Sequence, residues 1–421
     1  MHKKHAKNTV RYFIFLSFFL LFLFFSNDFG LTDVQKTAIV MAVGVDREEE
    51  TFIVTSQIAI PQSSKQGKAS ETVQIVSRGK TIAAAFEEIN AKTGWYPKLV
   101  FCRLILLGEK TVEQNVFDAL DFFLLDEYMS DNCLVATCKG TAKDMLNITA
   151  LVDPSGSVAI QKVLSSHAQR VGTVLPSTLR EFAIGYFSNS KSSYLPLLKT
   201  QPQQEQVGGS GGGSSGSSSG GQGGSSPGGG QDGGSDSSSS GNQGGSGSAQ
   251  SKQDKPVFSA GETALFVDGK LVGTLTREET FAFNVVKKDL KLASYSVDKD
   301  GATCTLTIKS NSPKTEFALG GDGRATMKIS VTLAAGLLDY SQALSLEAGK
   351  DVGSVPDGIF ETAEKRLTSQ IQTTFDKCRA CGCDIFGLNE TLHKKGKLEQ
   401  LNTPVLQNAI AEIKVQFENI R

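Results

Sequence analysis

The sequence contains few of the residues on which common enzymes depend. It has four histidines and one tryptophan in 421 residues. Outside its Gly/Ser-rich segment, it also lacks the Gly-x-Ser-x-Gly, Walker A and His-Glu-x-x-His motifs that position a nucleophile, a phosphate or a zinc ion. Basic residues are not in excess, because 43 Lys and Arg are balanced by 44 Asp and Glu, whereas a nucleic-acid binder usually carries a basic face. We therefore predict no catalytic residue, no cofactor and no nucleic-acid partner.

Cysteine is limited to seven residues, an odd number in a long chain, which argues against a small disulfide-stapled scaffold. Three of them, Cys378, Cys381 and Cys383, lie close enough in sequence to bind zinc or form a redox pair. However, Cys378 continues the apolar stripe of a predicted helix, and buried cysteine behaves as a small hydrophobic residue. We interpret the cluster as core or as an incidental disulfide, and keep a metal site as the alternative.

There is one long apolar run, from Tyr12 to Phe25. Basic residues precede it and acidic residues follow, an asymmetry that places the N-terminus in the cytoplasm and the rest outside. The run is marginal in length for a ~30 Å hydrocarbon core. No clean pair of small residues marks a signal-peptidase site, so residues 1–27 are predicted to form an uncleaved anchor, with a secreted product as the alternative. The first cysteine is Cys102, which excludes lipid attachment through an N-terminal cysteine in this chain.

Residues 201–255 are nearly free of apolar side chains and consist largely of Gly and Ser. Such a segment cannot offset its ordering entropy by burial, so we predict a flexible linker. About 50 residues of this composition would have an r.m.s. span of ~40 Å. The linker separates a predicted N-terminal domain (33–150) and a mostly helical connecting region (151–200) from a C-terminal domain (256–421).

The N-terminal domain alternates strand and helix patterns. Residues 52–60 have a period of two, typical of a half-buried strand. A helix is predicted to begin at its cap Thr81 and to end near Gly94. Residues 104–107 form a continuous apolar run with the length of a buried strand, and residues 133–138 indicate another strand. This order predicts an α/β domain.

The C-terminal domain combines hairpin strands with one long helix. Asp268-Gly269 is a hairpin-turn signal between strands at 263–267 and 271–275. Residues 359–375 carry an apolar stripe at helical spacing, and residues 413–417 alternate as a final strand. We predict an α+β domain in which the long amphipathic helix covers an antiparallel sheet, so that the whole chain is a mixed α/β and α+β multi-domain protein. In the first domain, the acidic run Asp46–Glu50 is interpreted as a solvated hairpin tip.

Five segments occur in an order that resembles a known family. They are residues 38–46, 79–109, 140–146, 264–280 and 383–387. Together they resemble the Ger(x)C family, the C subunits of bacterial spore nutrient-germinant receptors. The positions that carry the resemblance are Gly44, Asp46, Gly79, Thr81, Gly108, Glu109, Gly140, Ala142, Gly269, Lys270, Leu271, Gly273, Glu279, Asp384, Ile385, Phe386 and Gly387; below they are called the motif residues.

The resemblance implies a receptor subunit on the outer face of the spore inner membrane. Such a subunit works with two integral-membrane partners, of A and B type, in nutrient sensing, and the family has no established catalytic residues. This chain departs from the family in lacking the lipid-bearing cysteine and in having Trp95 as its sole tryptophan. Two alternatives remain: an anchored solute-binding protein, and a cysteine-dependent metal or redox protein of the envelope. The nutrient ligand is not identified by the sequence.

Overall fold

The computed structural model describes residues 12–21, 37–59, 72–148, 155–165, 171–201, 257–287, 290–320, 324–341, 355–396 and 405–420. The predicted linker, apart from Gln201, lies outside these residues, as do residues 1–11 and 22–27 of the predicted anchor region. Residues 12–21 are helical and exposed. Within the described ranges, no helix has both the length and the apolar composition that a membrane span requires.

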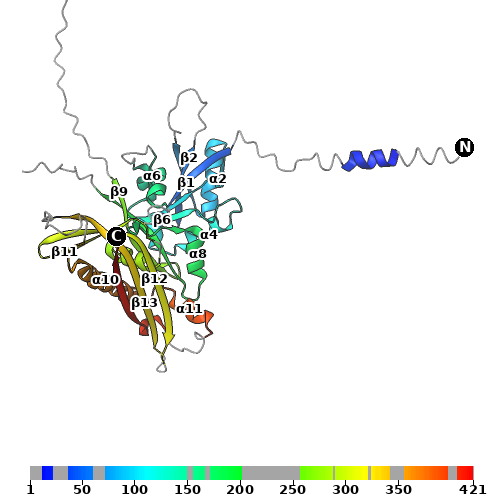
Figure 1. Cartoon of the computed structure of the whole chain (residues 1–421). Helices are drawn as coiled ribbons and strands as arrows, with labels where there is room; N and C mark the ends of the chain where they lie inside the picture. The colour runs from blue at the N-terminus through cyan, green and yellow to red at the C-terminus, as the bar shows by residue number, and fades with distance from the viewer. Residues whose placement is uncertain are drawn as a thin grey trace, which may run out of the picture.

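The first sheet has ten strands and a parallel centre (Figure 1). Strands β8, β6, β5 and β1 run parallel in that order, while β2 and β3 extend one side and β9 and β10 the other in antiparallel fashion. Short strands β4 and β7 pair with β1 and β6. The bounds are β1 Thr37–Glu48, β2 Thr51–Ala59, β3 Thr72–Gly79, β4 Tyr96–Lys98, β5 Leu104–Leu107, β6 Leu134–Cys138, β7 Ser177–Thr178, β8 Ser192–Gln201, β9 Val257–Val267 and β10 Lys270–Leu275.

Helices cover both faces of this sheet, and the alternation of side chains explains which face each strand residue occupies. Ile105 and Leu107 of β5 pack with helices α2 (Ile82–Thr93), α4 (Phe117–Leu125) and α8 (Leu179–Phe187). Leu104 and Leu106 pack on the opposite face with α5 (Ala142–Asn147) and α6 (Gly156–Val163). All four are fully buried, which confirms the predicted buried strand. A short helix, α3 (Glu109–Val112), follows β5.

The second sheet has the order β11-β12-β13-β14 and packs against a long helix (Figure 1). Its strands are β11 Ala293–Lys299, β12 Ala302–Leu319, β13 Ala325–Tyr340 and β14 Ile410–Asn419, and the helices of this half are α9 Arg277–Lys287, α10 Ile359–Cys381 and α11 Leu388–Lys394, with a 3-10 turn at Leu406–Asn408. The buried stripe of α10 joins these strands in one core, which confirms the predicted amphipathic helix. The antiparallel prediction is wrong for β14, which runs parallel to β13. Because α10 lies between them in the chain, it provides the crossover that parallel neighbours need.

Strands β8 and β9 show how the predicted regions connect. Residues 151–200 carry α6 and α8, but their last part is β8, an inner strand rather than a helical segment. Pro196 is tolerated there because β8 bonds to β6 only through Leu197 and Leu198, just past the proline. Strand β9, the first described element after the predicted linker, pairs antiparallel with β8. The chain therefore resumes in the same sheet that it left at residue 201.

Candidate functional site

Motif residues from three distant segments meet at one edge of the first sheet. Asp46 lies near the end of β1, Glu109 directly follows β5, and Gly140 and Ala142 follow β6. These three strands are parallel, so their carboxyl ends share an edge. In open α/β sheets this edge is where ligands bind. We therefore treat the carboxyl edge of β1, β5 and β6 as the candidate site.

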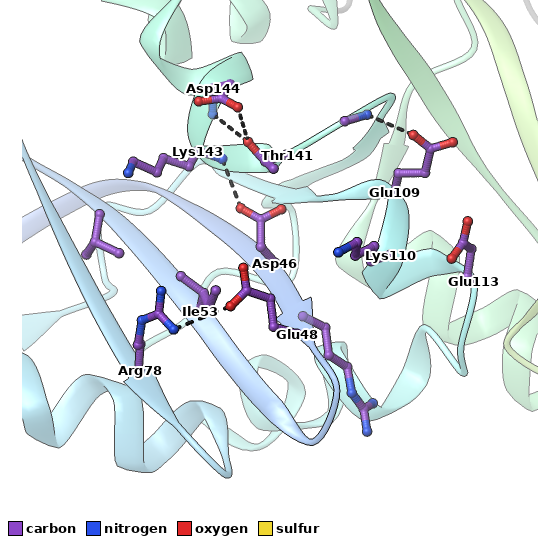
Figure 2. Close-up of a pocket in the computed structure, with 13 residues that line it drawn as sticks. Asp46, Glu48, Ile53, Arg78, Glu109, Lys110, Glu113, Thr141, Lys143 and Asp144 are labelled. Carbon is purple, nitrogen blue, oxygen red and sulfur yellow. Dashed lines mark hydrogen bonds and ion pairs between the residues drawn. The ribbon is translucent and has the colours of Figure 1, made fainter.

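Asp46 is used as a helix cap (Figure 2). Its Oδ1 accepts a hydrogen bond from the Ala142 amide at 2.7 Å, and its Oδ2 accepts one from the Lys143 amide at 3.1 Å, both at the start of α5. The residue is only 8% exposed, and burial raises the pKa of its carboxyl against the effect of the two amides, which lower it. The interpretation of Asp46–Glu50 as a solvated tip is therefore wrong for Asp46. The hairpin turns only at Glu49 and Glu50, while Asp46 still pairs with Ile53 in the ladder before the turn.

Two motif glycines make room for this cap. A Cβ on Gly108 would overlap Asp46 Oδ1, and a Cβ on Gly44 would lie 2.9 Å from Leu146 Cδ1. Gly108 has an ordinary φ of −70°, so the requirement at this position is space rather than backbone freedom. The Gly-x-Asp pattern at residues 44–46 thus has a packing explanation: β1 has to approach α5 closely before the carboxylate can reach the helix.

Glu109 joins the same edge from β5. Its Oε1 lies 2.6 Å from Lys139 Nζ, its Oε2 accepts from the Gly140 amide at 3.0 Å, and its own amide donates to the Gly140 carbonyl at 2.9 Å. The hydrogen bond from Lys139, followed by that from Gly140, lowers the pKa of this carboxyl. Gly140 has a φ of +78°, which glycine adopts without strain. The turn after β6 is therefore attached to both β1 and β5.

Beside these bonds lies an open pocket with a volume of about 530 Å³. Sequence reasoning missed several of its charged residues, including Arg47, Arg78 and Lys143, because no local pattern relates positions on different strands. Arg78 of β3 pairs with Glu48 of β1 at 3.4 Å, and the Arg47 guanidinium lies 4.9 Å from the centre of the Phe52 ring. The pocket is lined by Asp46, Arg47, Glu48, Ile53, Val76, Arg78, Glu109, Lys110, Glu113, Gly140, Thr141, Lys143 and Asp144. Basic and acidic groups therefore line the same cavity.

The motif residues Gly79 and Thr81 shape the start of α2. Thr81 Oγ1 accepts from the Ala84 amide at 3.1 Å, and the helix ends at Gly94 with a φ of +71°, which confirms both predicted ends. A Cβ on Gly79 would lie 2.5 Å from the Ala85 nitrogen. The helix can thus fold back directly from β3 only because residue 79 has no side chain.

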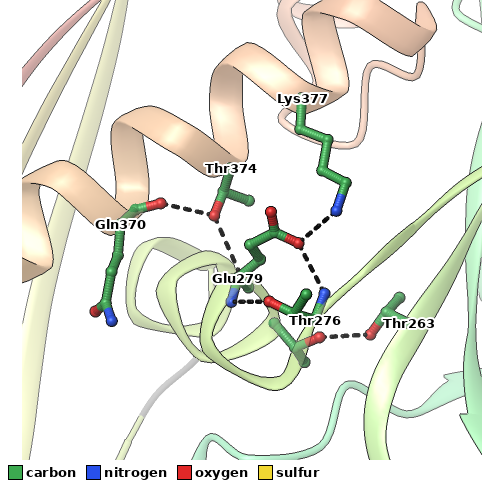
Figure 3. Close-up of polar contacts among 7 residues, drawn as sticks. Thr263, Thr276, Glu279, Gln370, Thr374 and Lys377 are labelled. Atoms are coloured by element: carbon green, nitrogen blue, oxygen red, sulfur yellow. Dashed lines mark hydrogen bonds and ion pairs between the residues drawn. The ribbon is translucent and has the colours of Figure 1, made fainter.

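The motif residues after the predicted linker lie elsewhere, where the two sheets meet. Glu279 and Thr276 cap the start of α9 reciprocally: the Thr276 amide donates to Glu279 Oε2 at 2.7 Å, and the Glu279 amide donates to Thr276 Oγ1 at 3.3 Å. Lys377 of α10 reaches the same Glu279 oxygen at 2.7 Å (Figure 3). The Thr-x-x-Glu spacing is a capping-box signal that could have been found in the sequence. Glu279 therefore links α9 to α10.

Asp384 caps α11 in a similar way. Its carboxylate accepts three amide hydrogen bonds, from Gly387 and Leu388 at 3.0 Å and from Asn389 at 2.7 Å. Its own amide donates to Ser192 Oγ on β8 at 2.9 Å. The residue is 3% exposed, and burial raises the pKa of its carboxyl. Asp384 thus attaches the segment after α10 to the first sheet.

The remaining motif residues after the predicted linker lie at this junction or in the β9–β10 hairpin of the first sheet. The Phe386 ring contacts the Phe283 and Phe375 rings at centroid distances of 5.1 and 5.6 Å, and Ile385 is buried in the same core. At the predicted hairpin, Asp268 and Gly269 both have positive φ, as an Asp-Gly turn requires. The Gly269 carbonyl accepts from the Val116 amide at 2.8 Å, and Lys270, Leu271 and Gly273 continue into β10. The hairpin thereby contacts the loop between α3 and α4.

The cysteine cluster belongs to the same core. Cys378 and Cys383 are fully buried, Cys381 is partly buried, and all three are free thiols. Burial raises the pKa of the Cys378 and Cys383 thiols, which disfavours the thiolate that metal binding or redox chemistry needs. Cys383 Sγ donates to the Phe266 carbonyl of β9 at 3.4 Å. In the part of the chain that the structure describes, no group of three or more His, Cys, Asp or Glu is arranged to hold a metal ion.

Comparison with family models decides the affiliation. Residues 31–200 match the spore germination protein N-terminal domain, and residues 261–420 match the spore germination B3/GerAC-like C-terminal domain. The chain belongs to the GerAC-like spore germination protein family. Among curated relatives, it is 26% identical over 133 residues to spore germination protein B3 of Bacillus subtilis (strain 168). That alignment covers 30% of this chain and 35% of the relative, so the chain spans about a third of the relative's length.

A solved relative shows the same fold. The crystal structure of the GerBC protein matches with a TM-score of 0.50 at 15% identity, covering 90% of this chain and 97% of the other. The resemblance to the Ger(x)C family is therefore confirmed, as is a mixed α+β fold with two sheets. Placed in this GerAC-like structure, the motif residues act largely as caps, turns and close contacts that join its elements.

Proposed function

We propose that this chain is a non-enzymatic, extracytoplasmic C subunit of a spore germinant receptor. The observation that carries the proposal is that its motif carboxylates form hydrogen bonds to the backbone at the starts of helices. Asp46 and Asp384 are buried and hold helix N-termini, and Glu279 caps α9 while pairing with Lys377. A general acid or base has to reach a substrate proton, whereas these groups already bond backbone amides. In this proposal, these motif carboxylates serve the assembly of the fold.

The proposal includes contacts with integral-membrane A- and B-type subunits and a role in nutrient sensing. Membership in the GerAC-like family supports a receptor complex. The apolar run at residues 12–25, with basic residues before it and acidic residues after it, supports an anchor that leaves residues 33–421 outside the membrane. In this arrangement the chain transmits a signal through its surfaces and not through a reaction.

The proposal is tested by deleting the gene in a strain without a redundant paralogue. The expected result is loss of germination, or a shift in its dependence, for particular nutrients, restored by the full-length chain. The deletion strain is also given a variant chain with the double substitution Leu16→Arg and Leu20→Arg. A charge at the centre of a span costs about 2.5–3.5 kcal/mol, so this variant should leave the membrane fraction and fail to restore germination, while Leu16→Phe should succeed. Normal germination of the deletion strain with every nutrient would contradict the proposal.

A second candidate function, solute binding, is favoured by the pocket at the carboxyl edge. Its volume suits a small molecule, and its Arg78 and Lys143 lie in the same cavity as Glu48 and Asp144, a charge arrangement that suits a zwitterion such as an amino acid. Calorimetry of the purified chain with amino acids and sugars tests it. Saturable heat that is lost in Arg78→Ala and kept in a control, Arg180→Ala, would support binding. Absence of heat with every compound would refute it without affecting the subunit proposal.

A further inference from the structure

Exposed apolar and aromatic side chains gather at the amino edge of the first sheet, opposite the Asp46 pocket. They lie in β4, at the last residue of α4, and in the loops that lead into β4, β5 and β6. Their exposed fractions run from 40% to 84%. They are Trp95, Tyr96, Val100, Phe101, Leu125 and Tyr128, and are called the amino-edge patch below. Single exposed apolar residues are ordinary, but a contiguous group marks an interaction surface.

Two contacts hold the segments that carry the patch against each other and against the sheet. Lys98 Nζ lies 4.7 Å from the centre of the Tyr128 ring, which joins β4 to the loop after α4. The Arg103 amide donates to the Met41 carbonyl at 3.1 Å, and so holds the loop that contains Phe101 against β1. The patch therefore rests on ordered strands of the sheet.

The patch lies beside the start of β1, the first strand after the apolar run at residues 12–25, which is called the leader below. In the parallel register of β1 and β4, Thr37 stands opposite Tyr96. Thr37 is 16 residues after Leu21, the last described residue of the leader helix, and 16 residues span at most roughly 55 Å. A bilayer that holds the leader would therefore be within reach of this edge.

The composition of the patch indicates what covers it. Trp and Tyr join an apolar ring to a polar end, and both are enriched where membrane hydrocarbon meets water. The sole tryptophan of the chain, Trp95, is in the patch. Charged residues of both signs occur in the same segments, with Lys98 and Arg103 around the loop between β4 and β5 and Asp126 and Glu127 after α4. Binding of the patch to a membrane should therefore not depend on anionic lipid, and a neutral bilayer should bind it as well.

We propose that the amino-edge patch rests on the outer surface of the membrane, with Trp95, Tyr96 and Phe101 among the lipid headgroups. This inference deepens the proposed function and depends on its anchored, extracytoplasmic placement. The Asp46 pocket then faces away from the bilayer, because it lies at the opposite edge of the same sheet. The patch fixes the orientation of the domain, which a tether of about 15 residues alone would leave free.

Tryptophan fluorescence tests the orientation directly, because all of the emission comes from Trp95. The full-length chain is reconstituted into phosphatidylcholine vesicles with bromine atoms near the headgroup end of the acyl chains. The expected result is a blue-shifted emission that brominated lipid quenches and aqueous iodide does not. In a matched control, Trp95→Phe is combined with Phe187→Trp. Phe187 is an exposed aromatic residue at the far end of α8, and its replacement should be quenched by iodide and not by lipid.

Flotation of the same vesicles separates the two proposals. If the chain does not float with the lipid, the anchor itself fails, and the orientation fails with it. If the chain floats while Trp95 is quenched by iodide and not by brominated lipid, only the orientation is overturned. A blue shift that appears only when other membrane proteins are added would also overturn it, in favour of a protein partner. Loss of lipid quenching in Tyr96→Ser/Phe101→Ser, in a variant that still floats, would support it.

Discussion

Replacing Asp46 with Ala removes a carboxylate that bonds two amides at the start of α5. Loss of a helix-capping side chain costs ~1 kcal/mol, in a range of about 0.5–2, and an unsatisfied buried amide adds about 1–3 kcal/mol. Part of this is offset because the carboxylate no longer has to be buried, which its raised pKa shows to be unfavourable. We expect a net loss of about 2–3 kcal/mol in the free energy of unfolding.

Gly108 gives the argument a second, independent test. Gly108→Ala alone should destabilise by about 1–3 kcal/mol, since the new methyl group displaces the Asp46 carboxylate from Ala142. In the double variant, which combines Asp46→Ala with Gly108→Ala, the new methyl group at residue 108 occupies the space that the Asp46 carboxylate leaves. The two losses should therefore fall short of additivity by about 1 kcal/mol or more. Gly273→Ala is the matched control, because its Cβ would meet nothing closer than Cys381 Sγ at 3.9 Å.

Denaturant unfolding of the parent, Asp46→Ala, Gly108→Ala and the double variant measures these free energies. Hydrogen exchange at the Ala142 and Lys143 amides shows whether the change is local. The surface control Asp118→Ala, whose carboxylate is 4.0 Å from Arg47, should cost no more than about 1 kcal/mol. The reasoning would be refuted by an Asp46→Ala protein that is as stable as the parent yet fails to support germination. That outcome would make Asp46 a working group of the pocket and not a cap.

Three further predictions concern Asp384, Glu109 and the cysteine cluster. Asp384→Ala should lower the free energy of unfolding by about 2–4 kcal/mol and speed hydrogen exchange at the α11 amides. Asp384→Asn should lower it by less. If both variants are as stable as the parent, Asp384 does not cap α11. The folded-state pKa of Glu109 is below its ordinary value of 4.5, so its contribution is present above 4.5 and lost as pH falls through the lowered pKa. Stability of Glu109→Gln should therefore decline less steeply than that of the parent in acid titration, and identical slopes would contradict this. Cys378→Ser places a hydroxyl in the core and should cost about 1–3 kcal/mol, whereas Cys383→Ser keeps a donor for the Phe266 carbonyl and should cost less; stoichiometric zinc in the parent protein, lost in both variants, would instead favour a metal site.

Local features could be predicted from the sequence because their causes are local. Thr81 caps a helix that ends at Gly94, and Asp268-Gly269 forms a hairpin turn, because side-chain hydrogen bonding and the freedom of glycine act within a few residues. The long helix could be predicted because its apolar stripe repeats over many turns. The capping pair Thr276 and Glu279 has an equally local cause, and its Thr-x-x-Glu spacing is a signal of the same kind.

Features that depend on distant pairing could not be predicted in this way. Asp46 bonds amides 96 and 97 residues away, and nothing beside it in the sequence distinguishes it from the solvated acids of the same run. A strand at residues 263–267 can be recognised after the Gly/Ser-rich segment, but alternation does not say that β9 pairs with β8, whose residues belong to a region predicted to be mostly helical. The parallel direction of β14 likewise depends on the crossover through α10, which period-two patterns do not report.

The most direct test of the account is purification of the full-length chain from spore membranes under conditions that preserve complexes. A non-enzymatic receptor subunit predicts that two integral-membrane proteins, of A and B type, are recovered with it in comparable amounts. They should also be recovered with Cys383→Ser, which leaves the fold intact. A chain that is recovered alone, or that converts a substrate by itself, would contradict the account.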